Sequence, residues 1–560
     1  MTLLRQLGLL QAVCLLGALS VPASGASAAP GQPVVTIPQG QLAGSFAGPL
    51  EVFKGVPYAL PPTGNLRWRP PAAPASWRGI RQATTFGPSC MQPALLAGNL
   101  YADPPAAMSE DCLTLNVWAP QAAHGAPVIV WIHGGALAIG GSSEQMYDGA
   151  NFARRGVVFV SINYRLGIFG WLALPALSTE SRHRASGDYG LLDQIAALQW
   201  VHANISAFGG DPANVTIMGE SAGALSVTYL LTSPLSRGLF QKAIAESANI
   251  RAVPELRQAA HGLPAAEQIG SKFATIAGVP TLASLRAMTP GALLQAAARA
   301  HFWTQATIDG WVLPEQVVDA FDRGHAARVP LLAGFNSGEI RSQRALLPAA
   351  PADAIAYTQR IERGYGDLAP VFLRLYPAAD IPESMLATVR DAVYGWATER
   401  LVRQESAAGA PSYLYFFDHC YPAARARKLC GFHASELPFV FGQIGQDAHL
   451  PPNWPRPLRA QDRALSAAMM AYWVGFARTG IPAGAGQPVW RPYSAAQSYM
   501  DFADTPRPGH HLLPGMFAMQ EQLVERRRKA GLRWFTNVGV AAPPLAGKPS
   551  GAHDVLPAGH

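Results

Sequence analysis

Residues 215–223 read VTIMGESAG, an apolar run followed by a G-x-S-x-G motif. The run Val215–Met218 is rich in β-branched residues without alternation, which is typical of a strand buried on both faces. Residues 222–231 then have a helical pattern. A serine between two glycines at a strand-to-helix turn is typical of a nucleophile elbow, in which the tight turn lifts the hydroxyl above the sheet edge. Ser221 is therefore the predicted nucleophile, since a simple strand-to-helix turn would not need this pattern.

A second glycine-rich turn follows another apolar run. Residues 128–136 read VIVWIHGGA, so a predicted strand ends in two glycines and an alanine. Small residues after a strand leave backbone N–H groups free to bind the oxyanion that forms during acyl transfer. The predicted donors are the N–H groups of Gly135, Ala136 and Ala222. An ordinary Gly-rich turn is the alternative, and the pairing with the elbow disfavours it.

The surrounding pattern predicts the fold class. A third β-branched run covers residues 157–162, and a helical pattern covers 191–206 before Gly209 and Gly210 interrupt it. Strand, helix and strand in this order indicate a parallel sheet with crossover helices. Residues 255–400 are Ala-rich and mostly helical in pattern, 413–417 form a later strand and 465–479 an amphipathic helix. The prediction is an α/β protein with a mostly parallel central sheet, helices on both faces and a helical insertion over the active site.

The two ends of the chain differ in composition from the rest. Arg5, an apolar stretch over residues 7–21 and an A-x-A pattern at 26–28 predict a signal peptide over residues 1–28. A membrane anchor is the alternative, but the stretch is short for a bilayer. Residues 29–537 are expected to form one catalytic domain, and the Pro-, Gly- and Ala-rich residues 538–560 a disordered tail. We expect a secreted or periplasmic protein with no integral membrane segment after signal cleavage.

Four cysteines follow the predicted leader: Cys90, Cys112, Cys420 and Cys430. An even number behind an export signal predicts disulfides, and of the three possible pairings the two local ones, Cys90–Cys112 and Cys420–Cys430, are favoured. No C-x-x-C pair is present, so neither a zinc site nor any other metal or organic cofactor is expected. The net charge of +7 is spread along the chain. The basic run 526–529 reads as a solvated helix face, so no nucleic-acid partner is expected.

The serine needs a base and an acid, which follow it in the order acid, then histidine, in this type of fold. His433, in the segment GFHASE at residues 431–436, has the best setting, a Gly-flanked loop after a predicted strand. His419 is a rival. Glu339 lies where a strand-end loop would begin, after an apolar run at 329–334. From the residues alone, three further acids stay open as alternatives: Asp309, Asp391 and Asp418.

Longer motifs on both sides of the elbow carry a family resemblance. They are FKGVPYA at 53–59, LRW at 66–68, EDCLTLNV at 110–117, NYRLG at 163–167, FGGDP at 208–212 and YWVGFARTG at 472–480. With these motifs, which span about three quarters of the chain, the sequence resembles the type-B carboxylesterases, the family that also contains the cholinesterases.

The resemblance implies an α/β-hydrolase fold and a serine carboxylesterase that acts on small-molecule esters through an acyl-enzyme. It assigns Glu339, in GFNSGE at 334–339, as the acid, and His433 as the base. It places Glu220 and Ser247 behind the triad, with Ser247 supporting Glu339. It also implies the Cys90–Cys112 disulfide, the same three oxyanion donors, and two structural ion pairs, Arg67–Glu110 and Arg165–Asp193.

The sequence departs from the family pattern at three positions near the site. Ala136 stands where many eukaryotic members have a third glycine, and Ile340 and Ala248 each replace a usual glycine. Residues 90–112 contain no Trp, so a quaternary ammonium would lack its aromatic partner there and a cholinesterase is disfavoured. Because all three triad residue types are present, a binding protein that has lost catalysis is also disfavoured. An amidase or a true lipase on the same machinery stays open.

Overall fold

A computed structural model describes residues 31–534 and 537–545. Its centre is an eleven-stranded sheet in the order β16-β15-β14-β13-β12-β11-β9-β10-β8-β4-β3. The strands from β10 to β15 in this order run parallel, and the pairs at the two ends of the sheet are antiparallel. The strand bounds are β3 Ser45–Ala47, β4 Leu50–Pro57, β8 Thr114–Pro120, β9 Ala126–Ile132, β10 Val158–Ile162, β11 Gly210–Glu220, β12 Lys242–Glu246, β13 Leu331–Asn336, β14 Ser412–Phe417, β15 Ser498–Phe502 and β16 Pro506–His510.

Two hydrophobic cores lie on the two faces of this sheet. Alternate side chains of a strand point to opposite faces. In β9, Val128 and Val130 accordingly belong to one core and Ile129 and Trp131 to the other. Helices α4 (Tyr189–Asn204) and α5 (Ala222–Thr232) cover the first face, and α16 (Ala460–Thr479) covers the second. This confirms the predicted fold class of a mostly parallel sheet between helical layers.

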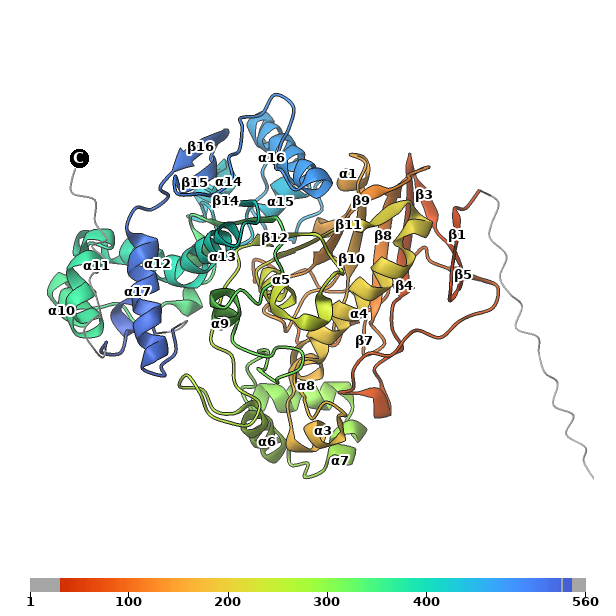
Figure 1. Cartoon of the computed structure of the whole chain (residues 1–560), viewed down its shortest axis with the longest axis horizontal. Coiled ribbons are helices and arrows are strands. Elements are labelled where there is room, and N and C mark those ends of the chain that lie inside the picture. The colour runs from red at the N-terminus through yellow and green to blue at the C-terminus, as the bar shows by residue number, and fades with distance from the viewer. Residues whose placement is uncertain (1–30, 535–536, 546–560) are drawn as a thin grey trace, which may run out of the picture.

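The helical region predicted over residues 255–400 contains one strand of the main sheet, β13. The helices therefore form one group before β13 and a second group after it. Figure 1 shows α10, α11, α12 and α17 gathered at the end of the molecule opposite strands β1 and β5, and α6, α7 and α8 along another side. The bounds are α6 Ala266–Ala277, α7 Leu282–Ala287, α8 Pro290–Arg299, α9 Val317–Asp322, α10 Ala354–Tyr365, α11 Ala369–Leu375, α12 Ile381–Arg390, α13 Trp396–Ala407 and α17 Met516–Lys529.

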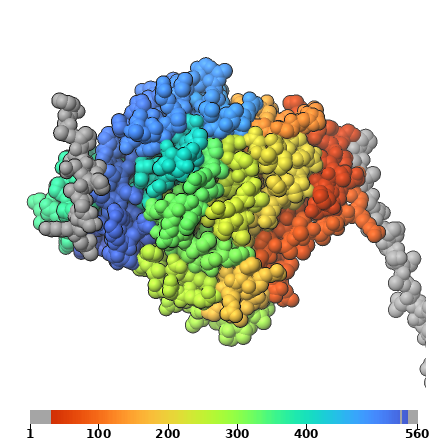
Figure 2. All heavy atoms as spheres, viewed as in Figure 1, coloured from red at the N-terminus to blue at the C-terminus, as the bar shows by residue number. Residues whose placement is uncertain are grey.

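Short elements complete the fold. Strand β2 lies between β1 and β5 in a three-stranded sheet, and β6 pairs with β7. On the surface drawn in Figure 2, the N-terminal strands lie at one end and the residues of the C-terminal helices toward the other. The remaining bounds are β1 Val34–Ile37, β2 Gly40–Ala43, β5 Ile80–Gln82, β6 Ser89–Cys90, β7 Met108–Ser109, α1 Ala150–Ala153, α2 Gly167–Trp171, α3 Pro175–Glu180, α14 Pro422–Ala426 and α15 Leu437–Val440.

The disordered tail was predicted to begin at residue 538, but the chain is still packed there. Residues 538–545 are described, and Gly539–Ala541 forms a 3₁₀ turn with Val540 buried. The Gly539 N–H donates to the Tyr365 hydroxyl at 2.8 Å, which fixes this segment against α10. Apolar side chains in this Ala- and Pro-rich stretch find a partner surface that the local composition does not reveal. Residues 546–560 and the predicted signal peptide, 1–28, lie outside the described residues.

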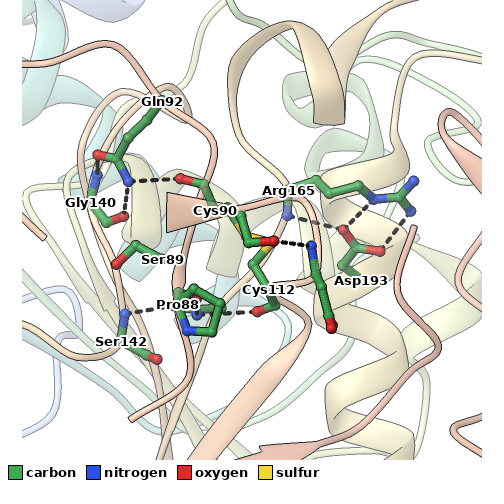
Figure 3. Close-up of a disulfide and its surroundings, with 12 residues drawn as sticks. Pro88, Ser89, Cys90, Gln92, Cys112, Gly140, Ser142, Arg165 and Asp193 are labelled. Carbon is green, nitrogen blue, oxygen red and sulfur yellow. Dashed lines mark hydrogen bonds and ion pairs between the residues drawn. A yellow bond between two sulfur atoms is a disulfide. The ribbon is translucent and has the colours of Figure 1, made fainter. Parts of the chain in front are cut away.

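Both predicted disulfides are present, with Cα atoms 5.0 Å apart in Cys90–Cys112 and 4.6 Å apart in Cys420–Cys430. Beside the first lies the ion pair between Arg165 and Asp193 (Figure 3), in which Nε and Nη2 each contact one carboxylate oxygen at 2.7 Å. Both side chains are almost fully buried. The predicted Arg67–Glu110 pair is also bidentate, with Nε 2.6 Å from Oε1.

The basic run at the end of α17, residues 526–529, makes ion pairs and hydrogen bonds with other residues of the protein. Arg526 pairs with Asp367, Arg528 with Asp319 and Asp322, and Lys529 with Glu525. Arg527 is buried and donates to the Asn537 carbonyl. The three arginines therefore fasten α17 to neighbouring elements rather than forming the solvated helix face that was predicted, and Lys529 alone is exposed. Within residues 31–534 and 537–545, no helix has the length and apolar character needed to cross a membrane, and no group of three or more His, Cys, Asp or Glu side chains could hold a metal ion.

The buried Arg165–Asp193 pair generates a stability prediction. Asp193→Asn leaves the Arg165 charge buried without its counter-charge, so we expect the free energy of unfolding to fall by about 3–5 kcal/mol. Denaturant unfolding followed by circular dichroism measures this. Glu525→Gln is the matched control, because it breaks an exposed pair on one helix that is worth about 0.3–0.5 kcal/mol. Equal losses in the two variants would contradict a special role for the buried pair.

Candidate active site

Ser221 occupies a strained turn between β11 and α5. Its backbone has φ +55° and ψ −118°, a conformation that a residue with a side chain rarely adopts. The glycines on either side permit this turn: a Cβ on Gly223 would lie 2.0 Å from the Ile132 carbonyl oxygen, and one on Gly219 would lie 2.5 Å from the Gly223 carbonyl carbon. The Ser221 N–H donates to the Glu246 carbonyl at 2.9 Å, which fixes the turn to strand β12.

The loop after β9 lies beside this turn. Gly135 has φ +100° and Ala136 φ +56°, and a Cβ on Gly135 would lie 2.1 Å from the Ile139 carbonyl oxygen. The N–H groups of Gly135 and Ala136 donate no backbone hydrogen bond among the described residues. Ala222 is the first residue of α5, where N–H groups have no acceptor within the helix. All three N–H groups are therefore free to bind an anionic oxygen.

Two contacts hold this loop in place. The His133 ring stacks on Tyr164 with centroids 4.5 Å apart, and the Tyr164 hydroxyl donates to the His133 carbonyl at 2.9 Å. From the first disulfide loop, the Gln92 amide both donates to and accepts from the Gly140 backbone, at 2.7 and 2.8 Å (Figure 3). The disulfide loop thus supports the far end of the glycine-rich turn.

The structure brings Ser221, His433 and Glu339 into one chain of hydrogen bonds. His433 Nε2 lies 2.8 Å from Ser221 Oγ, and its Nδ1 lies 2.6 Å from Glu339 Oε2. The other carboxylate oxygen, Glu339 Oε1, accepts from the Ser247 hydroxyl at 2.7 Å and from the Asn336 N–H at 2.9 Å. Glu339 is fully buried, so its charge faces the imidazole through a dry interior.

The alternatives left open by the sequence lie elsewhere. His419 is buried between Asp462 and Asp504, with nitrogen–oxygen distances of 2.9 and 3.1 Å. Asp309 accepts backbone N–H groups from residues 311–313 in its own turn. Asp391 is bound by Arg390 and by the Tyr376 hydroxyl. Asp418 is exposed to solvent. None of these contacts involves His433 or Ser221.

Glu220 contributes a second carboxylate to the imidazole. Its Oε1 lies 3.2 Å from His433 Nε2, the nitrogen that also faces Ser221. Burial by itself lowers the pKa of His433, but the charges of Glu220 and Glu339 outweigh burial and raise that pKa to about 9. Burial raises the pKa of Glu220 to about 7, although His433 opposes the rise. This arrangement stabilises an imidazolium at the site.

Two further buried glutamates near the triad were not predicted from the sequence to belong to the site. Glu246 accepts from the Trp473 indole at 2.7 Å, and Glu436 accepts from the Asn336 side-chain amide. Both are fully buried, and burial together with neighbouring carboxylates raises the pKa of each well above its usual range. Glu436 belongs to the quoted motif GFHASE, and Glu246 precedes Ser247. The two come together because β12, which ends at Glu246, pairs with β13, whose last residue Asn336 binds Glu436.

The chain around this site is similar to known esterases over most of its length. The family model described as "Carboxylesterase family" matches residues 31–365 and 376–523. The chain is 35% identical over 503 residues to the fumonisin B1 esterase of Sphingopyxis macrogoltabida, covering 87% of this chain and 89% of that protein. It is 34% identical over 459 residues to the para-nitrobenzyl esterase of Bacillus subtilis (strain 168), covering 80% and 90% of the two chains. A solved PNB esterase structure superimposes with a TM-score of 0.75 at 32% identity, covering 87% of this chain and 99% of that one.

The Glu220 carboxylate generates a prediction about pH. The expected base must be neutral to accept a proton, so kcat/KM for ester hydrolysis should fall as pH drops through the pKa of His433. Because the Glu220 charge raises that pKa, Glu220→Gln should lower it and move this acid limb to lower pH by about 1 pH unit. Rates measured from pH 5 to pH 10 test this. Glu383→Gln is the control, since it removes the same charge from a half-exposed pair with Arg341. An unmoved limb in Glu220→Gln would contradict the assignment.

Proposed function

Because the chain belongs to the carboxylesterase family and is a carboxylic ester hydrolase with an α/β-hydrolase fold, we propose that it acts through an acyl-enzyme on Ser221. His433 is the general base and Glu339 the acid that orients it. The observation that carries the proposal is the hydrogen-bonded chain from Ser221 Oγ through His433 to Glu339, with links of 2.8 and 2.6 Å.

In the first half of the reaction, His433 Nε2 takes the hydroxyl proton while Ser221 Oγ bonds to the ester carbonyl carbon. The carbonyl oxygen becomes an oxyanion, and the free N–H groups of Gly135, Ala136 and Ala222 stabilise it. The intermediate collapses, the bond to the alcohol oxygen breaks, and that oxygen takes the proton from His433. The acyl group is left as an ester on Ser221.

In the second half, His433 takes a proton from water, and the resulting hydroxide oxygen bonds to the acyl carbon. The bond to Ser221 Oγ then breaks and the serine recovers its proton from the imidazolium. Glu339 holds Nδ1–H throughout, so Nε2 stays the free nitrogen. Glu220 and Glu339 together stabilise the positive ring that exists in both halves.

We further propose that the protein is exported and acts on small-molecule esters outside the cytoplasm. The A-x-A pattern at 26–28 supports export, as do the disulfides Cys90–Cys112 and Cys420–Cys430, which persist in oxidising compartments. The names of the relatives suggest which substrates to test first. A panel of p-nitrophenyl esters of increasing acyl length, a p-nitrobenzyl ester and fumonisin B1 separates short-chain from bulky substrates.

The nucleophile assignment predicts a severe effect of one substitution. Ser221→Ala should lower kcat by about 10⁴-fold or more, because oxyanion stabilisation and substrate binding alone remain. An organophosphate should label wild-type enzyme on Ser221, as read by peptide mass spectrometry, and should not label the variant. An adduct on another serine, or an active Ser221→Ala enzyme, would sink the proposal.

The acid assignment predicts a graded series. Glu339→Gln keeps the size of the side chain but removes the charge that stabilises the imidazolium, so we expect kcat to fall by about 10²–10⁴-fold. Asp309→Asn is the matched comparison, because it neutralises a carboxylate that contacts only its own turn. Its kcat should stay within a few-fold of wild type when measured on folded protein. The reverse ranking would show that the acid is misassigned.

A further inference from the structure

The acid and the base of the triad belong to two loops far apart in the sequence. Glu339 lies in the segment 337–343 after β13, and His433 in the segment 431–436 before α15. One backbone hydrogen bond joins them directly, from the Gly338 N–H to the Gly431 carbonyl at 2.8 Å. The 2.6 Å contact between Glu339 and His433 depends on the relative position of these two loops. Side chains from two other elements also span the gap between them.

The first of these side chains is Tyr101, from the disulfide loop between Cys90 and Cys112. Its hydroxyl lies 2.7 Å from Ser342 Oγ and 3.0 Å from the His433 carbonyl oxygen. Both contacts are hydrogen bonds at once when Ser342 donates to Tyr101 and Tyr101 donates to the carbonyl. The Tyr101 ring also meets the His433 ring edge-on, with centroids 6.5 Å apart. One phenol therefore touches the acid loop and the base loop together.

The second is Tyr394, from a single π-helical turn over Asp391–Gly395. Such turns insert one extra residue into a helix and often occur at functional sites. The Tyr394 ring lies over the His433 ring at 5.0 Å with the planes 32° apart, and its hydroxyl donates to Gln343 Oε1 at 2.8 Å. Just before the turn, Arg390 donates to the Ser337 carbonyl at 3.0 Å, which fixes the turn against the acid loop.

We propose that Tyr101 and Tyr394 form a clamp that holds the acid loop to the base loop and so positions His433 between Glu339 and Ser221. Both are positioning residues: the Tyr101 hydroxyl binds Ser342, the Tyr394 hydroxyl binds Gln343, and each ring contacts the imidazole. The inference rests on the proposed function, since it concerns the geometry of that triad. It adds two tyrosines, on elements outside the triad loops, that neither the elbow nor the oxyanion loop involves.

The clamp has a chemical consequence besides rigidity. An imidazole held in place loses little orientation between its neutral and protonated forms, so each proton transfer starts from a productive geometry. Loosening the ring would lengthen its contacts to Glu339 and Glu220, the charges that raise the pKa of His433. Loss of the clamp should therefore change both the rate of proton transfer and the pH at which the base becomes neutral, whereas substrate binding should change little.

The test removes the hydroxyls and keeps the rings. We expect Tyr101→Phe, which removes two buried hydrogen bonds, and Tyr394→Phe, which removes one, each to lower kcat by about 3- to 30-fold, with KM within about twofold of wild type. The acid limb of kcat/KM should move to lower pH in both. Tyr357→Phe is the matched control, because it removes a buried phenol hydroxyl that donates to the Tyr376 carbonyl and touches neither loop. Its kcat and pH profile should equal those of wild type.

Substitution from the other side of each bond keeps the proposal testable if a tyrosine variant folds poorly. Ser342→Ala should lower kcat and move the acid limb in the same direction as Tyr101→Phe, by no more than that variant, because it removes one of the two hydrogen bonds of Tyr101. The double variant should be no slower than Tyr101→Phe. Gln343→Ala should do the same for Tyr394→Phe. Wild-type kcat and pH profile in these variants, multiplicative losses in the pairs, or an equal loss in Tyr357→Phe would each overturn the clamp. An active Ser221→Ala enzyme would instead overturn the proposed function, so the two failures are distinguishable.

Discussion

The turn at Ser221 is the constraint on which the rest of the site depends. A residue with a side chain is held there at positive φ, at a cost of about 1–3 kcal/mol. Close backbone packing prevents its relaxation, because Gly223 presses on the last carbonyl of β9 and the Ser221 N–H binds the last carbonyl of β12. The same device recurs along this edge of the sheet. Ser247 follows β12 at φ +54° and donates to the Gly334 carbonyl in β13, and Ala136 follows β9 at φ +56°. These three strained turns follow parallel strands that end at the same edge of the sheet, and the sheet supplies the rigidity that maintains them.

Electrostatics at this edge are set by an excess of buried carboxylates over cations. Three glutamates act on the His433 imidazole, Glu220, Glu339 and Glu436, and a fourth, Glu246, interacts with Glu436 and Glu220. Burial raises the pKa of Glu246 and Glu436 well above the usual range and so favours their uncharged forms, and both accept hydrogen bonds, from Trp473 and Asn336. Glu220 and Glu339 touch the ring nitrogens and act on its charge. The site therefore favours a positive imidazole, which suits the proposed reaction, in which that species forms twice.

The sequence predicted those parts of the molecule that local chemistry determines. Apolar runs without alternation identified β9, β10 and β11, and glycine patterns identified the turns after β9 and β11, because a buried strand and a tight turn each leave a signature within a few residues. Contacts between distant segments leave no such signature. Tyr394 lies in a helical stretch with nothing local to separate it from a core residue, and Glu246 and Glu436 meet only through strand pairing. The packed segment at 538–545 was missed for the same reason, since its partner surface is on α10 and α12.

Distance along the chain also explains why different parts of the site are held in place by different elements. The proposed nucleophile and the proposed oxyanion loop follow adjacent strands, β11 and β9, so the sheet register brings them together, and contacts from Tyr164 and Gln92 hold the loop in place. The proposed base, His433, follows β14 through a longer loop, and the proposed acid, Glu339, lies three residues after the end of β13. A loop leaves its side chains free to move unless other elements restrain them. Restraint comes from outside the sheet, from the first disulfide loop and from the π-helical turn between α12 and α13. Segments of the chain that carry none of the proposed catalytic atoms thereby support the proposed triad, because a catalytic arrangement held within about 0.5 Å needs support wherever the sheet does not provide it.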